Sequence, residues 1–169
     1  MPVQRNFAAN MMWIRLIFSC WDTVWAVILP LMQEKKLSWL KGIIMLVPYD
    51  PTVLLDSGKE VYLNSLLNEG KILHSDGLDA IYYDILENRG NLVFTAAYEE
   101  VKDKNILIFA AQKDTVSVNE KMIVPLWNKL SSGKTYAVQR LIEYPVEHGL
   151  IGRRISVIRD IAEFISSVI

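Results

Sequence analysis

The sequence predicts an α/β fold with three layers, αβα, in which helices cover both faces of a mostly parallel sheet. Two observations favour this fold class. Short apolar runs without polar alternation recur along the chain, and such runs are typical of parallel strands that are buried on both faces. Segments with apolar residues at helical spacing separate these runs, so strands and helices alternate. With 169 residues, the chain has the size of one domain, which we expect to span 1–169.

The composition limits the classes of function. Lys and Arg number 18 against 19 Asp and Glu, a formal net charge of −1, so no overall basic charge favours nucleic acid as a partner. One cysteine and two histidines at unrelated spacings do not form a zinc-site pattern. No G-x-G-x-x-G motif suggests a dinucleotide site. We therefore expect no metal and no cofactor and, from the lack of a disulfide framework, a reducing, cytoplasmic location.

The first third of the chain contains an apolar run over 11–32 that is long enough to cross a bilayer, which takes about 20 residues. Arg15 and Asp22 lie inside it, and each charge costs about 2.5 to 3.5 kcal/mol at mid-membrane. We therefore divide the run into a buried strand over 13–18 and a buried helix over 22–33, and we expect no membrane partner. A membrane anchor is the alternative.

Three further segments are predicted to be strands. The runs KGIIMLV at 41–47 and NILIFAA at 105–111 are continuously apolar after their first residues, which indicates burial on both faces. A turn rich in proline follows the first run, and Lys113, Asp114 and Thr115 form the turn after the second. The segment 137–144 is predicted to be the last strand.

Helices are predicted between and after these strands. Two amphipathic helices flank a polar connection at 70–77, and others are expected over 92–99, 119–130 and 154–168. In the last helix we expect one apolar stripe to pack on the sheet. This stripe consists of Ile155, Ile158, Ile161, Ala162 and Ile165.

Two side chains with complementary chemistry follow neighbouring predicted strands. Asp114 comes after the 105–111 strand and His148 after the 137–144 strand. Ligand sites of parallel sheets lie beyond the carboxyl ends of the strands, so both side chains should emerge at the same edge. A carboxylate there can fix the tautomer of an imidazole and stabilise its protonated form, as an acyl-transfer base requires. The alternative is that Asp114 caps a turn and His148 is an ordinary loop histidine.

Three motifs extend this pattern: K-D followed by V-x-V-N-E within 113–120, a V-P-L-W-N-K-L helix, and Y-P-x-x-H-G before a final helix. Together they resemble the C-terminal portion of the α/β-hydrolase family, in its esterase and prolyl-oligopeptidase-like branch. The resemblance implies that Asp114 is the triad acid and His148 the triad histidine. It also implies a small helical cap insertion over 56–97 and a small-molecule acyl substrate, which would be an ester, a thioester or a peptide.

The match departs from the family at the nucleophile. When the G-x-S-x-G elbow is laid on Phe18-Ser19-Cys20-Trp21-Asp22, Cys20 takes the nucleophile position and both glycines are missing. A cysteine is chemically adequate beside an imidazole, and the backbone N–H of Trp21 would be an oxyanion donor. The alternative is that Cys20 is a small buried core residue.

The N-terminal strands of the family have no counterpart before residue 13, so we expect a partial α/β-hydrolase fold and an enzyme that is truncated or impaired. The strand over 13–18 would then be an exposed sheet edge, open to a second copy or another partner. The competing function is a non-catalytic relative that uses the same scaffold for binding or assembly.

Overall fold

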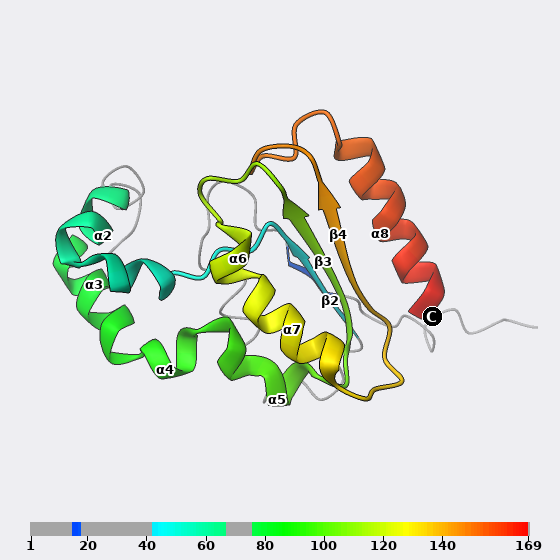
Figure 1. The fold of residues 1–169 in the computed structure, drawn as a ribbon, viewed down its shortest axis with the longest axis horizontal. Coiled ribbons are helices and arrows are strands. Elements are labelled where there is room, and N and C mark those ends of the chain that lie inside the picture. The colour runs from blue at the N-terminus through cyan, green and yellow to red at the C-terminus, as the bar shows by residue number, and fades with distance from the viewer. Residues whose placement is uncertain (1–14, 18–41, 67–75, 169) are drawn as a thin grey trace, which may run out of the picture.

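A computed structural model describes residues 15–17, 42–66 and 76–168 of the chain (Figure 1). Within these ranges, four strands form one sheet in the order β1-β2-β3-β4, and every neighbouring pair is parallel. The strands are β1 (Arg15–Ile17), β2 (Gly42–Leu46), β3 (Asn105–Ala111) and β4 (Gln139–Tyr144). The predicted α/β class with a parallel sheet is confirmed.

The strand predictions agree closely with the structure. The bounds of β3 are those predicted, and β1 and β2 lie inside the predicted segments. β4 begins at Gln139, two residues later than expected, because the two preceding amides are bound by side chains. The N–H of Ala137 donates to the hydroxyl of Thr135, and that of Val138 donates to the side-chain oxygen of Asn105.

The helices fall into two groups along the chain. Those before β3 are the 3₁₀ helices η3 (Val53–Ser57) and η5 (Phe94–Ala97) and the α-helices α2 (Lys59–Ser65), α3 (Leu78–Glu87), α4 (Arg89–Leu92) and α5 (Tyr98–Val101). Those after β3 are α6 (Asn119–Met122), α7 (Val124–Ser132) and α8 (Arg154–Val168). Figure 1 shows α2, α3 and α4 beside the sheet rather than directly on it.

Two predicted helices are interrupted. The single helix expected over 92–99 is wrong: Val93 is extended, with φ −59° and ψ 133°, and separates α4 from η5. The helix expected over 119–130 is divided at Ile123 and ends two residues late, at Ser132. Pro125 accounts for this break, because proline has no N–H to donate to the carbonyl four residues earlier.

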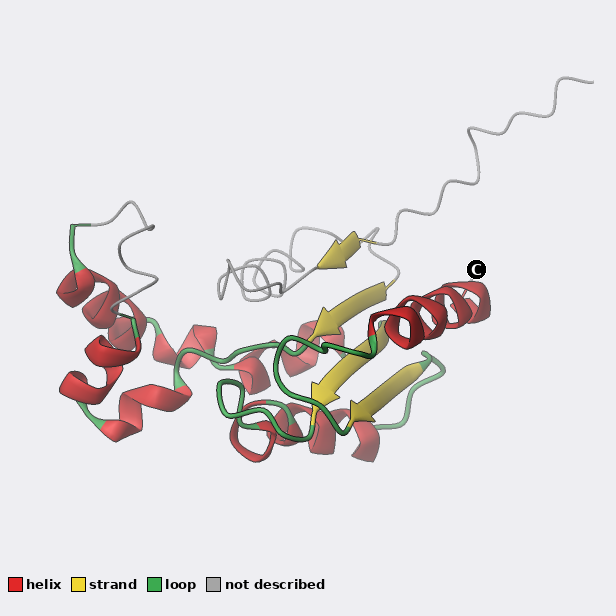
Figure 2. Cartoon of the chain, turned by 90° about the horizontal axis from the view of Figure 1, so that it is seen from above, coloured by secondary structure: helices red, strands yellow, loops and turns green. Residues whose placement is uncertain are grey.

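The core has two parts, one on each face of the sheet, because successive side chains of a strand point to opposite faces. On one face Ile106 and Ile108 pack with Leu126 of α7, and the helices before β3 belong to the same apolar cluster. On the other face Leu107 and Phe109 of β3 pack with α8. Figure 2 shows α8 on one side of the sheet and α7 on the other.

α8 packs on the sheet with a stripe that matches the predicted one only in part: Ile161 and Ile165 contact the apolar cluster as expected. Ile155 and Ile158 are 86% and 66% exposed, whereas Val157 and Phe164 are buried. The predicted packing is therefore wrong for the first two isoleucines. Asp160 explains the rotation of the helix, because it accepts a hydrogen bond from the hydroxyl of Tyr144 and so faces β4.

Some sequence predictions concern residues that the structure does not describe. The helix expected over 22–33 lies outside the described residues. In the part of the chain that is described, none of the helices has both the length and the apolar character that crossing a bilayer requires.

The orientation of α8 can be tested by comparing two alanine variants. Phe164→Ala removes a fully buried ring, and we expect it to lower the free energy of unfolding by about 3 to 5 kcal/mol. Ile158→Ala changes an exposed position, and its effect should stay within about 0.5 kcal/mol. Urea unfolding followed by circular dichroism measures both, and equal losses would contradict the orientation.

Candidate functional site

The pairing of β3 with β4 continues beyond the ends of both strands. Ala111 lies opposite Tyr144 at the last position of the ladder. The N–H of Gln112 then donates to the carbonyl of Tyr144 at 2.8 Å, and the N–H of Lys113 donates to that of Val146 at 3.0 Å. The loops that carry Asp114 and His148 therefore leave the sheet side by side.

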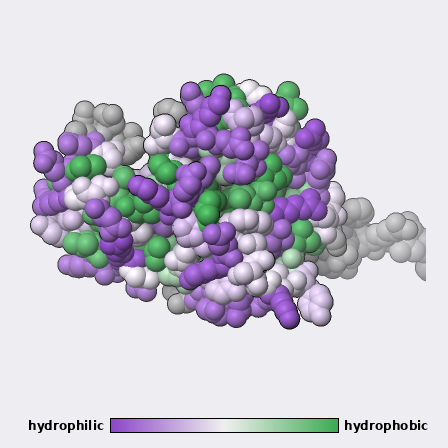
Figure 3. All heavy atoms as spheres, in the orientation of Figure 1, coloured by the Kyte–Doolittle hydropathy of each residue, from purple (hydrophilic) through white to green (hydrophobic). Residues whose placement is uncertain are grey.

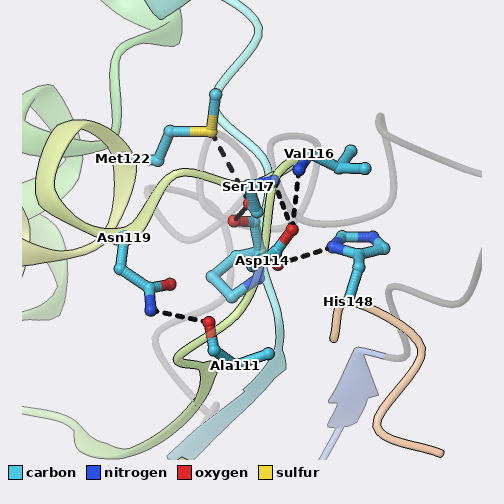
Figure 4. A network of polar contacts seen from close by, with 8 residues as sticks. Ala111, Asp114, Val116, Ser117, Asn119, Met122 and His148 are labelled. Atoms are coloured by element: carbon cyan, nitrogen blue, oxygen red, sulfur yellow. Dashed lines mark hydrogen bonds and ion pairs between the residues drawn. The ribbon is translucent and has the colours of Figure 1, made fainter. Parts of the chain in front are cut away.

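Asp114 and His148 are in direct contact at this edge (Figure 4). The Nδ1 atom of His148 lies 2.8 Å from the Oδ2 atom of Asp114. The Asp114 side chain is fully buried, while 18% of the His148 side chain is exposed. With Nδ1 held by the carboxylate, the Nε2 atom is the ring nitrogen that can exchange a proton with another group.

The second oxygen of Asp114 holds its own loop. Its Oδ1 atom accepts hydrogen bonds from the N–H groups of Val116 and Ser117, each at 2.8 Å. The carboxylate thus caps a turn with one oxygen and meets the imidazole with the other. The sequence left open whether Asp114 caps a turn or faces His148, and in the structure its side chain does both. The turn fixes the direction in which the carboxylate faces His148.

Two buried polar residues attach the Asp114 loop to the sheet. The hydroxyl of Ser117 donates to the carbonyl of Pro48, just after β2. The side-chain amide of Asn119 donates to the carbonyl of Ala111 at 2.9 Å. Neither residue was predicted to have a role of its own, and their signal in the sequence is slight: two short polar side chains, each preceded by a valine, within the V-x-V-N-E motif.

The backbone at this edge contains two unusual conformations. Leu150 and Val47 have φ values of 50° and 45°, in the left-handed region that costs an L-residue about 1 to 2 kcal/mol. Both side chains are buried in the apolar cluster beneath α8, which offsets the strain. Leu150 also closes a turn by donating its N–H to the carbonyl of Glu147, so the turn that carries His148 is anchored in the core.

A cavity of about 390 Å³ lies between the segment after β2 and the loop after β3. Its apolar lining includes Tyr49, Val53, Leu54, Leu66, Val116 and Val118. Figure 3 shows apolar groups at the surface in the middle of this face, where the helices before β3 meet the sheet-bearing part. Thr115, Val116 and Val118 line the cavity, so it borders the loop that holds Asp114.

Asp50 connects the end of β2 to the helices before β3. Its side chain accepts hydrogen bonds from the N–H and hydroxyl of Thr52 and from the N–H of Phe94. Burial raises the pKa of this carboxyl above 3.8, although the hydrogen bonds from Phe94 and Thr52 partly oppose that effect. The bond to Phe94 also explains the break in the helix predicted over 92–99, since it fixes the start of η5.

The structure does not describe the two other predicted site residues. Cys20 and Trp21, expected as nucleophile and oxyanion donor, lie outside the described residues. Within the described ranges, no group of three or more His, Cys, Asp and Glu side chains could hold a metal ion.

No protein-family model and no curated protein matches this chain. The geometry at the carboxyl edge of the sheet is therefore the observation that bears on its function.

The role of Asp50 can be tested by replacing it with alanine. Asp50→Ala leaves the buried N–H groups of Thr52 and Phe94 without their acceptor, and each such loss costs about 1 to 3 kcal/mol. Because the folded-state pKa of Asp50 is raised, the folded protein binds the proton more tightly than the unfolded chain does. The contribution of Asp50 to the free energy of unfolding should therefore fall as pH rises from about 3.8 through the folded-state pKa.

That contribution should be absent in Asp50→Ala, so the difference in stability between the two proteins should shrink as pH rises through this window. Urea unfolding between pH 3.5 and pH 7, roughly the range that brackets an upward-shifted carboxyl, measures this difference. Asp103→Ala, at an exposed position, is the matched control. A difference that does not depend on pH would contradict the raised pKa.

Proposed function

We propose that the chain is an α/β-hydrolase-like protein that hydrolyses an acyl bond, with His148 as general base and Asp114 as the residue that orients it. The observation that best supports this function is the 2.8 Å contact between Nδ1 of His148 and Oδ2 of Asp114. Both residues follow adjacent parallel strands at the edge where such sheets bind ligands. Asp114 also precedes His148 along the chain, and the acid precedes the histidine in the family that the motifs resemble.

In the proposed reaction, Nε2 of His148 takes the proton of the nucleophile as that atom attacks the substrate carbonyl. Asp114 stabilises the imidazolium that forms and keeps its ring in place. His148 then gives the proton to the leaving group as the bond to that group breaks. In the second half of the cycle His148 takes a proton from water as the water attacks the acyl-enzyme. His148 then returns this proton to the nucleophile as the bond between the nucleophile and the acyl carbon breaks, which releases the acid and restores the enzyme.

The nucleophile in this proposal is Cys20, on the strength of its alignment with the elbow motif alone. A thiol beside an imidazole is readily converted to the reactive thiolate. The N–H of Trp21 would stabilise the oxyanion, and loss of one such donor typically costs about 100- to 1,000-fold in rate. We further propose that the segment over 56–97 is the cap. This is supported by the helices of that segment, which border the cavity beside the Asp114 loop.

The contribution of Asp114 can be tested with Asp114→Asn. An asparagine oxygen can still accept the N–H groups of Val116 and Ser117, so the loop should keep its shape. Its amide nitrogen would face Nδ1 of His148 and favour the wrong tautomer. We expect kcat for p-nitrophenyl acetate to fall by about 10³- to 10⁴-fold, with little loss of stability.

His148→Ala should cause a similar loss, and the double variant should be no worse than either single variant, since the two residues act as a unit. Asp103→Asn serves as the control. Full activity in both single variants would end the catalytic proposal. A correctly folded protein without any esterase activity would instead favour the non-catalytic binding or assembly role.

The nucleophile can be tested separately because the chain has a single cysteine. A fluorescent iodoacetamide therefore reports on Cys20 alone. We expect His148→Ala to slow labelling of the native protein by tenfold or more, the order of the loss of thiolate when its base is removed. Equal labelling rates in the native protein and in His148→Ala, together with full activity in Cys20→Ala, would remove Cys20 from the mechanism. Labelling by a fluorophosphonate would then point to a hydroxyl nucleophile instead.

A further inference from the structure

The cavity beside the Asp114 loop combines an apolar lining with one cationic side chain. Among its described lining residues, Lys121 is the only charged one, and the other polar groups include the hydroxyls of Ser57, Ser65 and Thr115. Its volume, about 390 Å³, is within the range of roughly 300 to 1,000 Å³ found for small-molecule sites. An apolar chamber with a single cation fits a ligand that has an apolar body and one negative charge.

The cavity borders the loop that carries Asp114. Thr115, Val116 and Val118 form one of its walls, and the N–H of Val116 is a donor to the carboxylate of Asp114. The loop that holds Asp114 against His148 is thus the loop that a ligand in the cavity would touch. Asp114 and His148 are not among the described residues that line the cavity, so a bound ligand would contact the loop that carries Asp114.

Lys121 is available to an anion. It lies on α6, its residue is exposed, and no other described residue forms an ion pair or a hydrogen bond with its ammonium group. No carboxylate is found among the described residues that line the cavity. Because Lys121 is exposed, water partly screens an ion pair at this place, so the pair adds modestly to the binding that the apolar walls supply.

We propose that this cavity binds the apolar part of a singly anionic amphiphile and that Lys121 pairs with its negative charge. The inference rests on the proposed function and deepens it: the substrate class is an ester or thioester whose apolar part carries one carboxylate. Lys121 is then a residue that determines specificity, and it takes no part in the chemical steps.

The test uses three eight-carbon probes that differ in the charge of the head group: octanoate, 1-octanol and octyltrimethylammonium. Isothermal titration calorimetry on the full chain should show that octanoate binds best and that the cationic probe binds worst. Lys121→Gln should weaken octanoate by roughly two- to fivefold, the size of one exposed ion pair, and leave 1-octanol unchanged. Lys134→Gln, an exposed lysine in the connection between α7 and β4, should change neither.

A second variant tests the location. Ser57 is exposed at the cavity wall, so Ser57→Trp should fill the chamber without disturbing the core, and it should abolish binding of octanoate and 1-octanol alike. Octanoate binding that survives Ser57→Trp, or that is unaffected by Lys121→Gln, would overturn the inference. Because these measurements need neither the nucleophile nor turnover, an inactive protein that still prefers octanoate would refute only the proposed hydrolysis.

Discussion

The parallel pairing of β3 with β4, carried past the ends of both strands, is the constraint on which the site depends. Backbone hydrogen bonds from Gln112 and Lys113 keep the two segments paired beyond the end of β3. Asp114 and His148 then meet at 2.8 Å although their loops share no local sequence. A slip of one residue in this register would exchange the side chains of β3 between the two apolar clusters, so the core that stabilises the strand also positions the site.

The sequence predicted best those elements whose burial is uniform. β3 is buried at six of its seven positions, and a continuous apolar run leaves no doubt about such a strand. In contrast, α8 carries a broad apolar arc that includes both Phe164 and Ile155, so the periodicity alone suited more than one orientation. The bond from Tyr144 to Asp160 selects one of them, and a contact between separate elements leaves no trace in a helical pattern.

The contact between Asp114 and His148 could be expected because parallel strands end at a common edge. The residues that support this contact could not be predicted in the same way. Ser117 reaches Pro48 across 69 positions of sequence, and Asp50 reaches Phe94 across 44. Each of these bonds joins the segment after β2 to a residue far along the chain, so it forms only once the sheet has formed. The same long-range bond from Asp50 also broke a helix that local propensity had favoured.

The departures from local rules gather at one edge of the molecule. Val47 and Leu150, two non-glycine residues with positive φ, follow β2 and β4, and the buried carboxyl with a raised pKa, Asp50, follows β2 as well. Elsewhere in the described ranges the chain mostly follows its apolar pattern. Strain and buried charge persist only where the surrounding structure supports them, and in folded proteins they cluster at working sites. This clustering favours the carboxyl edge as the functional region on physical grounds that do not depend on the resemblance to any family.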